Sequence, residues 1–445
     1  MDHDLIVEQL LDRCKCCIEH ILQAPDLHRV ATASLAIFAQ LREGAREMLQ
    51  AKMTLEAQPL KSADVARCCQ DSRMRYLHTR TVSPQTLWGE VYIPGRTFQC
   101  RGCGASLRPD DRHLGVPEVG DCTDDVRARY APVVAELPHR VATDLFYQCT
   151  GGALSSCGAQ GIIDSTAKDL QRWQAERERQ QSVAVGDTLG AGDGRSERRV
   201  EVAMDGVMAH IDGRGQEAKV ATILVRRLEA APAAPTLGAI LARRYVGILG
   251  AAEDLAARIT QVIREAGWES IPMGEMLGDG APGIWNVAAA HVPGVRQTLD
   301  DDHLSEHLYA VAHLLSPNNP AGANTGVEQN MGALLMDRVG EVLRALKRLR
   351  PWQKPVRDAL VQLIGYVGRN RTRIRYREPW YAGLAVGSGA VEGACKPVIQ
   401  RRFQRAGLRW KPAGFLNVLA LRLARLHGDF QAFWASRGLA GEASG

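Results

Sequence analysis

The chain has 445 residues, which is too long for one ordinary domain and suits two or three. Its composition is globular, with 45% hydrophobic and 24% charged residues, and its net charge of +5 is modest. No apolar stretch reaches the ~18 residues of a membrane span, and the first residues lack the basic start of a signal peptide, so we expect a cytoplasmic protein with no membrane partner.

Positive charge gathers in the C-terminal half. Between Arg344 and Arg377 there are eleven Lys and Arg residues against one acid, Asp358. From Gly393 to Gly428 there are eight and no acid. A basic surface suits a polyanionic partner, because Lys and Arg displace condensed counterions from phosphates. One such run alone would be explained as a solvated helix face.

The N-terminal part of the chain changes character several times. Apolar residues at helical spacing predict two helices in residues 1–60. Residues 61–120 are rich in Gly, Pro and Cys, and residues 121–182 return to a helical pattern that starts at the cap Thr123-Asp124-Asp125. Residues 183–199 are rich in Gly and Asp with little to bury, which predicts a linker.

Residues 200–430 are predicted to form the largest domain, followed by a tail at 431–445. The patterns indicate strands at Val200–Met204, Val207–Ile211 and Val220–Arg226, a helix at Ala251–Ala266, a strand at Glu275–Leu277, a helix at Ile284–His291, a strand at Val295–Leu299 and a long helical region from His303. Asp205-Gly206 is interpreted as the turn that ends the first strand. This order is that of the ribonuclease-H-like fold. We therefore expect an α/β catalytic core of ribonuclease-H-like type with a helical insertion at about 303–385.

Three acids stand where such a core supplies metal ligands: Asp205 at the first strand, Asp279 at the fourth and Glu392 at a late helix. Two Mg²⁺ about 4 Å apart can activate the attacking oxygen and stabilise the leaving one in phosphodiester transfer, and Mg²⁺ prefers carboxylate oxygens. Taken singly, Asp205 and Asp279 are better explained as Asp-Gly turns than as ligands, and Glu392 could be a first-turn acid beside a helix dipole.

Longer motifs around these acids resemble one family. Residues 387–396, Gly-Ser-Gly-Ala-Val-Glu-Gly-Ala-Cys-Lys, with Arg401-Arg402 and Gly407-Leu408-Arg409-Trp410, resemble the C-terminal signature of the ISKra group of bacterial insertion-sequence transposases, which are related to Mutator-like transposases. Residues 277–281, followed by Ile284-Trp285-Asn286, resemble the group's second-Asp motif, and Ala203-Met204-Asp205-Gly206 resembles its first. The resemblance covers about residues 68 to 426.

The resemblance implies a DNA transposase that cleaves DNA and transfers strands at the ends of an insertion sequence. It implies Asp205, Asp279 and Glu392 as the catalytic triad that holds Mg²⁺ or Mn²⁺. The implied partners are double-stranded DNA, as the element's terminal repeats and as target, and further copies of the chain in a homo-oligomer assembled on DNA. The implied location is the nucleoid of the bacterial cytoplasm. The 113 residues between Asp279 and Glu392 (392 − 279) leave room for the helical insertion of such transposases.

Mutator-like relatives carry an Asp- or Cys-x-x-His element between the second Asp and the Glu. Leu299-Asp300-Asp301-Asp302-His303 resembles this element, with Asp300 and His303 at the matching positions as accessory residues. Relatives usually have aromatic residues where Asp301 and Asp302 stand. An equally good explanation is a solvated first helix turn, in which Asp offsets the dipole.

The cysteine region predicts a zinc-ribbon-like fold in residues 61–120. Cys100-Arg101-Gly102-Cys103 spaces two thiolates to bind one tetrahedral Zn²⁺. Cys68-Cys69-Gln70-Asp71 stands where the resembling family has Cys-x-x-Cys, with Asp71 at the second Cys position. The candidate zinc ligands are Cys68, Asp71, Cys100 and Cys103, with Cys69 or His78 as substitutes. The alternative is that metal binding has been lost and the region folds without it.

A DNA-binding surface is expected from basic and aromatic residues near the third acid. Arg369, Arg371, Arg373 and Arg375 alternate on one face of a predicted extended segment, and aromatic residues follow. The candidate DNA-binding residues are Arg371, Arg373, Lys396, Arg401, Arg402, Arg405, Arg409 and Trp410. Pro397 should disturb the helix after Glu392, because it removes a backbone hydrogen bond.

The helical region 121–182 offers a second DNA-binding hypothesis. Helices at about Val141–Cys149 and Gly161–Trp173, joined around Gly151-Gly152, would form a helix-turn-helix that reads terminal repeats. Two packed helices without this role explain the pattern equally well. For the whole chain two alternatives remain: a ribonuclease-H-like nuclease without strand transfer, and a DNA-binding relic of a transposase.

Overall fold

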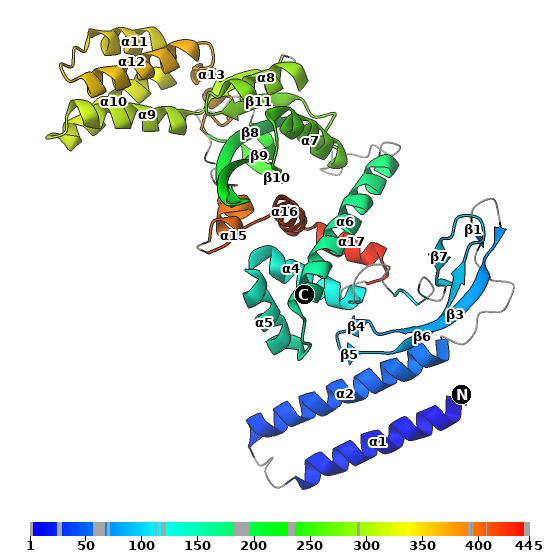
Figure 1. Cartoon of the computed structure of the whole chain (residues 1–445). Helices are drawn as coiled ribbons and strands as arrows, with labels where there is room; N and C mark the ends of the chain where they lie inside the picture. The colour runs from blue at the N-terminus through cyan, green and yellow to red at the C-terminus, as the bar shows by residue number, and fades with distance from the viewer. Residues whose placement is uncertain are drawn as a thin grey trace. The chain divides into compact units, whose positions relative to one another are not determined.

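The computed structural model describes residues 3–24, 29–56, 67–68, 72–109, 111, 114–116, 122–181, 196–229, 236–291, 294–387, 389, 393, 395–405 and 407–439. The chain divides into two compact units, Met1–Asp169 with Phe430–Gly445, and Leu170–Asp429 (Figure 1). Each unit is described by itself. No helix in the described ranges combines the length and apolarity that crossing a membrane requires.

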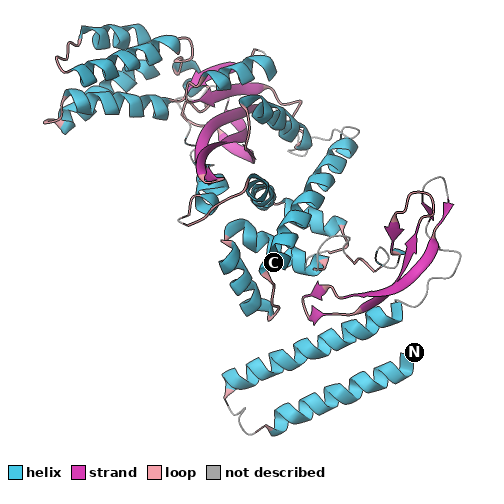
Figure 2. Ribbon diagram, viewed as in Figure 1, coloured by secondary structure: helices cyan, strands magenta, loops and turns pink. Residues whose placement is uncertain are grey.

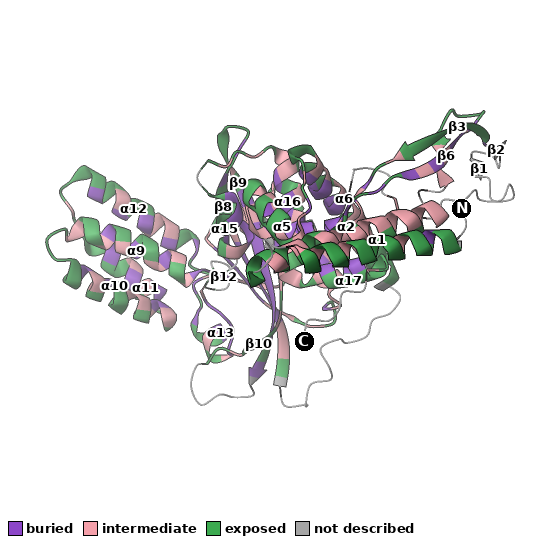
Figure 3. Ribbon diagram, turned by 90° about the horizontal axis from the view of Figure 1, so that it is seen from below, coloured by how far each residue is buried: buried purple, intermediate pink, exposed green. Residues whose placement is uncertain are grey.

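The first unit begins with the two helices that the spacing of apolar residues predicted. α1 spans His3–Gln23 and α2 spans Val30–Glu56, and they lie side by side (Figures 1 and 3). An ion pair between Arg13 and Glu47 links them. The pairing leaves much apolar surface uncovered, since no residue of the fully described α2 is buried.

Short strands follow, shown in magenta in Figure 2. They are β1 (Arg67–Cys68), β2 (Ser72–Arg73), β3 (Arg75–Val82), β4 (Gln85–Thr86), β5 (Gly89–Glu90), β6 (Ile93–Gln99) and β7 (Ser106–Leu107). β1 pairs with β2, β4 pairs with β5, and β3, β6 and β7 form an antiparallel sheet in that order. The sheet packs Met74, Phe98 and Cys100 into a small core.

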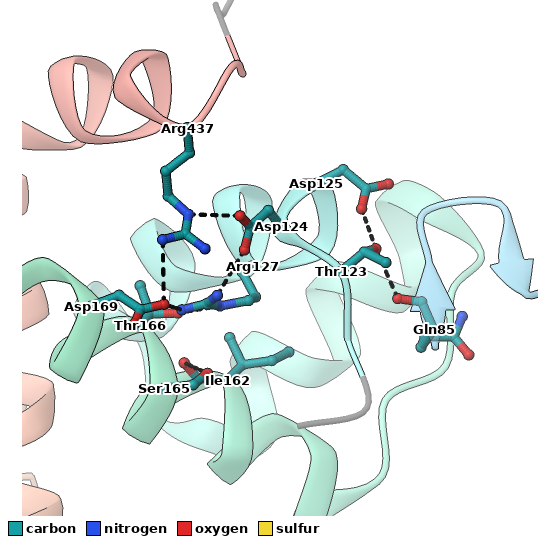
Figure 4. A network of polar contacts seen from close by, with 10 residues as sticks. All are labelled: Gln85, Thr123, Asp124, Asp125, Arg127, Ile162, Ser165, Thr166, Asp169 and Arg437. Atoms are coloured by element: carbon teal, nitrogen blue, oxygen red, sulfur yellow. Dashed lines mark hydrogen bonds and ion pairs between the residues drawn. The ribbon is translucent and has the colours of Figure 1, made fainter. Parts of the chain in front are cut away.

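Three helices complete the unit with a C-terminal helix: α4 (Asp124–Glu136), α5 (His139–Thr150), α6 (Ser156–Gln181) and α17 (Asp429–Ser436). α4 begins at the predicted Thr123 cap. The guanidinium of Arg127, only 3% exposed, binds Asp124 at 2.7 Å and Asp169 at 2.7 Å (Figure 4). Arg437, just after α17, also reaches Asp124 at 2.6 Å, so this network fastens the C-terminal segment to α4 and α6.

The second unit is built on a five-stranded mixed sheet. Its strands are β8 (Ser196–Ile211), β9 (Arg214–Glu229), β10 (Ala239–Ile248), β11 (Met273–Gly278) and β12 (Arg296–Leu299). The spatial order is β10-β9-β8-β11-β12. β8, β9 and β10 are antiparallel, whereas β11 runs parallel to β8 and β12 parallel to β11. α7 (Ala252–Glu265) precedes β11, and α8 (Pro282–His291) precedes β12. From α7 to α9 the order of helices and strands agrees with the prediction.

The predicted turn at Asp205-Gly206 is wrong. β8 continues through this pair to Ile211 and pairs with β9 along its whole length. The turn lies at Asp212-Gly213, where both residues have positive φ, 50° and 74°, as a two-residue hairpin of type I′ requires. The predicted strands on either side of Asp205-Gly206 are therefore one strand, and β10 was missed.

The two faces of the sheet carry different side chains. Val202 and Met204 of β8 pack in an apolar core with Ile259 of α7. Because side chains alternate along a strand, Glu201, Ala203 and Asp205 belong to the opposite face. That face contacts η3, a π-helical segment at Lys396–Gln400, and α16 (Pro412–His427) lies against both η3 and β10.

The insertion is helical, as expected, and Figure 1 shows it in yellow and orange. It contains α9 (Asp301–Leu315), α10 (Pro320–Leu335), α11 (Val339–Arg348), α12 (Lys354–Arg369) and the short α13 (Arg377–Tyr381). Leu304, Leu334 and Leu363 share one buried core with Trp285 of α8 and Leu299 of β12. The bundle is therefore packed directly on the end of the sheet that carries Asp279.

Candidate active site

The sheet places Asp205 and Asp279 on neighbouring strands. β11 runs parallel to β8, and Gly278 lies opposite Met204. Asp279 and Asp205 are the next residues along the two strands, so their Cα atoms are about 5 Å apart, the usual spacing of paired strands. Two acids 74 positions apart in the sequence (279 − 205) are thus side by side at the carboxyl end of β11.

Local geometry explains why Asp279 is followed by Gly280. The Asp279 carboxylate accepts a hydrogen bond from Ala281 N at 2.8 Å, which closes a tight turn after β11. Gly280 has φ +93°, and a Cβ atom there would lie 2.9 Å from the Tyr366 ring and 3.0 Å from Leu299. Only glycine fits this backbone and this space.

Burial and neighbouring charge act together on Asp205. Burial is the largest cause that raises the pKa of this carboxyl, and the charge of Asp279 raises it further. Hydrogen bonds from Gly206 N at 2.7 Å and from Cys395 Sγ at 3.5 Å, and the nearby His303, lower it in part. The folded protein therefore disfavours ionisation of the Asp205 carboxyl, and a cation bound beside it would favour the ionised form.

The third predicted acid, Glu392, lies outside the described residues. The chain on both sides of it is described at Gly387 and Cys395. A Cβ atom on Gly387 would lie 2.2 Å from Asp301 Oδ1, and Asp301 N donates to Val386 O at 3.1 Å. Cys395, 3% exposed, reaches Asp205. The described residues on the two sides of Glu392 therefore contact Asp205 in the middle of β8 and Asp301 at the start of α9, directly after β12.

The two predicted accessory residues lie in the first turn of α9. Asp300 is the N-cap of this helix and accepts a hydrogen bond from Asp302 N at 3.0 Å. Asp300 N also donates to Gly278 O at 2.9 Å, which ties the cap to β11 beside Asp279. His303 is close enough to Asp205 to affect the pKa of that carboxyl. Asp300 therefore caps α9, as the alternative explanation expected, and the first turn of α9 lies next to Asp205 and Asp279.

Asp301 and Asp302, which depart from the family pattern, meet the start of the Glu motif at Gly387. Burial, followed by the charges of Asp302 and Asp300, raises the pKa of Asp301 to about 7. One ligand atom from each of these three acids lies within 4.8 Å of the others. They form a second acidic group next to the first.

Three side chains near the acids were not predicted as site residues. Tyr366 of α12 donates its hydroxyl to Asp279 O at 2.6 Å, and the His307 ring lies 4.6 Å from the Tyr366 ring. Cys395 is the third. It stands inside the quoted signature, so the sequence carried a signal for it. Tyr366 and His307 lie on long helices whose pattern indicates packing alone.

The donor set fits a hard divalent cation. Asp205 and Asp279 offer carboxylate oxygens, which Mg²⁺ and Mn²⁺ prefer. A cation beside them would also oppose the effect of burial and the smaller effect of the Asp279 charge, which both raise the pKa of Asp205. With Glu392 these residues would hold the metal. Such an ion stabilises charge on the attacking and leaving oxygens of a phosphodiester.

The cysteine region folds into part of the expected knuckle. Cys100 N donates to Ala105 O at 2.8 Å and Gly104 N to Cys100 O at 3.1 Å, so Cys100 and Cys103 share one tight turn between β6 and β7. Cys68 lies on β1 opposite Ser72 of β2. Asp71 and Cys69 lie outside the described residues, and His78 is an exposed residue of β3. Zinc binding stays a prediction.

The predicted extended segment at residues 369–375 is wrong, because Arg369 ends α12 and the chain then turns. Arg371 and Arg375 are exposed, while Arg373 is half-buried. Ile374 and Tyr376 point inward, 1% and 0% exposed. The buried Ile374 and Tyr376 side chains hold this turn against the core, and Arg371 and Arg375 stay on the surface.

The predicted basic surface includes Arg402, and for this residue the prediction is wrong because Arg402 is buried. Lys396, Arg401, Arg405 and Arg409 are exposed, but Arg402 is 2% exposed. Its guanidinium lies 4.9 Å from the ring of Trp410. Trp410 is itself held by the β8–β9 hairpin, since Asp212 N donates to Trp410 O at 2.9 Å. Arg402 and Trp410 therefore pack together, and the buried Arg402 offers no exposed guanidinium to DNA.

The helix around Pro397 is disturbed, as predicted. Lys396–Gln400 is π-helical, and the Pro397 carbonyl accepts a hydrogen bond from the buried Arg422. Single π-helical turns frequently occur at functional sites. Here the widened turn directly follows Cys395.

The hypothetical helix-turn-helix corresponds to α5 and α6, joined through Gly151 in the left-handed conformation, φ 67°. The exposed side chains in the first turns of α6 include Cys157, Gln160 and Asp164. This surface has no basic residue before Lys168. The helices are present, while their DNA-binding role stays a hypothesis.

In comparisons with known proteins, no family model matches this chain, and a search of curated proteins finds no match.

Proposed function

We propose that the chain is a metal-dependent DNA transposase whose acids are Asp205, Asp279 and Glu392. The observation that carries this proposal is the parallel pairing of β8 and β11, which sets Asp205 beside Asp279. The pairing supports the proposal because in-line phosphodiester transfer needs acids that can share metal ions.

The surroundings of Glu392 give further support. Cys395, three residues after Glu392, contacts Asp205, and three residues span at most about 11 Å of chain. Gly387, five residues before Glu392, borders Asp301. The sheet order β10-β9-β8-β11-β12 and the helical insertion support the ribonuclease-H-like core expected from the sequence.

Each part of the chain has a role in the proposed reaction. Asp205 and Asp279, with Glu392, hold Mg²⁺ or Mn²⁺ at the scissile phosphate. The exposed Lys396, Arg401 and Arg405 bind DNA phosphates beside the acids. The apolar residues that α1 and α2 leave exposed suit the expected homo-oligomer.

The test is a DNA cleavage and strand-transfer assay with the DNA that flanks the gene. Glu392→Gln should keep DNA affinity and abolish cutting and joining, because the amide loses the negative charge that binds metal. A barrier increase of about 4 kcal/mol would be roughly a thousandfold rate loss. Glu328→Gln, an exposed acid of α10, is the matched control and should retain the parent rate.

The outcomes separate the proposal from its alternatives. Cutting without joining of pre-cut ends would indicate a nuclease. Binding without any Mg²⁺-dependent cutting by the parent protein would indicate a DNA-binding relic. Joining at the parent rate by Glu392→Gln would require another acid in its place.

A further inference from the structure

A hollow of about 430 Å³ lies at the outer edge of β12, apart from the two aspartates. Its lining comes from two segments, β12 and the turn that follows α12 together with α13, and its polar residues include Arg296, Gln297, Thr372, Arg373, Arg375 and Glu378. Arg296 precedes Asp300 by four residues, about 13 Å along a strand. The hollow therefore lies within the same unit as the acids but does not include them.

The hollow carries excess positive charge. Three guanidiniums and one carboxylate line it, a net charge of +2 (3 − 1). Glu378 Oε1 pairs with Arg296 at 2.5 Å, and this ion pair lowers the pKa of Glu378. Among the described residues, no carboxylate lies at ion-pair distance from Arg373 or Arg375. At this edge Arg373 therefore has no carboxylate at ion-pair distance, and Arg375 has only the longer-range charge of Glu378.

Arg373 is held in place by neutral groups. Its Nε donates to Gln297 Oε1 at 2.9 Å, and its Nη1 donates to Asn370 Oδ1 at 3.3 Å. The guanidinium lies 4.5 Å from the ring centroid of Trp285, which is 6% exposed. Burial lowers the pKa of Arg373, and no acid opposes this effect. Because the half-buried Arg373 guanidinium is held in one orientation and has no acid beside it, it is well placed to bind an anion.

The donors fit a phosphate group. Guanidinium groups offer paired N–H donors that match phosphate oxygens, and Thr372 adds an exposed hydroxyl. The hollow is larger than a phosphate alone, so it leaves room for the adjoining sugar. We propose that this pocket binds one backbone phosphate of a DNA strand whose neighbouring part lies at the acids. The identity of the ligand rests on the proposed function.

A phosphate fixed here would position the strand relative to the acids. β12 connects the pocket to Asp300. The backbone N–H of Asp300 donates a hydrogen bond to Gly278 O, next to Asp279. A rigid strand thus transmits the position of the bound phosphate to the site of cutting. Exposed residues such as Arg401 would add to the affinity for DNA, but they would not fix the position of a phosphate relative to the acids.

The test compares two double variants that each remove two positive charges. Arg373→Gln with Arg375→Gln removes the two positive charges of the pocket that form no close ion pair. Arg214→Gln with Arg227→Gln is the matched control, because both residues are exposed on β9 and do not line the hollow. Affinity for a labelled DNA duplex is measured by fluorescence anisotropy in EDTA over a range of salt concentrations.

The pocket variant should bind about tenfold more weakly, as expected for charged hydrogen bonds. Its log–log salt slope should fall by about 0.9, the value for one phosphate. The control should lose at most about twofold in affinity. Equal losses in the two double variants, or no loss in the pocket variant, would overturn the proposal.

Further variants guard against misfolding. Arg375→Gln alone changes an exposed side chain and should still weaken binding. Glu378→Gln should strengthen binding severalfold, because it removes the only acid that lines the hollow in the described chain. Weaker binding by Glu378→Gln would contradict the proposal.

Inorganic phosphate distinguishes the two sources of this ligand. If it raises the Tm of the parent protein but not of the pocket variant, while both bind DNA equally, the pocket serves free phosphate and the DNA assignment is wrong. These binding measurements need neither Mg²⁺ nor cutting. Failure of the catalytic proposal would therefore leave their outcome unchanged, and their failure would leave the catalytic test unchanged.

Discussion

Cys395 Sγ donates a hydrogen bond to Asp205 Oδ2 across 3.5 Å, although 190 positions separate the two residues in the sequence. Asp205 lies in the middle of β8, and Cys395 lies immediately before the π-helical η3. The contact therefore joins the first acid of the sheet to the segment that carries the Glu motif. It also lowers the pKa of Asp205 against the larger effect of burial.

Replacement of Cys395 should affect the reaction through Asp205. Cys395→Ala removes the donor, and a lost hydrogen bond of about 1 kcal/mol corresponds to roughly a fivefold lower rate. Cys395→Ser keeps a donor and should retain most of the activity. The pH dependence of the cutting rate should move upward in the Ala variant and not in the Ser variant. Identical pH profiles for both variants would show that the contact is only structural.

Asp205→Asn should stabilise the metal-free protein while it abolishes activity. The folded state raises the pKa of Asp205, so ionisation of this carboxyl at neutral pH disfavours folding. A gain of about 1 kcal/mol would raise Tm by about 2–4 °C. Asp212→Asn, an exposed residue of the β8–β9 turn, is the control and should change neither property. A lower Tm for Asp205→Asn in EDTA would contradict this explanation.

Glu275 should make stability depend on pH. Burial, as the larger cause, and the charge of Glu201 raise the pKa of this 0% exposed carboxyl to about 8 from its usual 4.5. The unfolded chain therefore ionises first, and stability present below pH 4.5 is lost as the pH rises to about 8. The slope is about 1.4 kcal/mol per pH unit at most.

Glu275→Gln should flatten this slope in urea unfolding measured from pH 5 to 8. The pKa of Asp301, raised to about 7, gives a slope of the same sign at lower pH. Asp301→Asn is therefore the comparison variant, and it should keep the slope between pH 7 and 8. An unchanged slope in Glu275→Gln would mean that this carboxyl is ionised in the folded protein.

Arg401 and Arg402 should behave differently despite being neighbours. Arg401 is exposed, so Arg401→Ala should weaken DNA binding and leave Tm unchanged. Arg402 is packed on Trp410, so Arg402→Ala should cost about 2 kcal/mol of stability. Thermal unfolding and anisotropy on the same samples measure both effects. Equal Tm values would show that Arg402 contributes nothing to packing.

Zinc should be found in the purified protein if the knuckle is intact. Cys100→Ser should then lower the metal content and destabilise the sheet of β3, β6 and β7, because Cys100 is 2% exposed and part of its core. Cys157→Ser, an exposed cysteine of α6, is the control. Metal analysis without zinc, together with an unchanged fold in Cys100→Ser, would favour a region that has lost its metal.

Much of the architecture could be predicted because it depends on local patterns. Helical spacing of apolar residues located α1, α2 and α7, and the order of helices and strands from α7 to α9 agrees with the prediction. One Asp-Gly pair, Asp205-Gly206, was wrongly predicted to be a turn. Asp-Gly is a common turn signal, but at Asp205 the pairing of β8 with β9 continues through it, and the turn falls at Asp212-Gly213.

Only the tertiary structure decided which residues meet. Parallel pairing of β8 and β11 sets Asp205 beside Asp279, and packing of α12 brings Tyr366 to the Asp279 carbonyl. Charge alone also cannot distinguish Arg402 from Arg401, because burial depends on where Trp410 is held by the β8–β9 hairpin. Sequence determines the chemistry available at each position, whereas long-range packing determines which groups are close enough to act together.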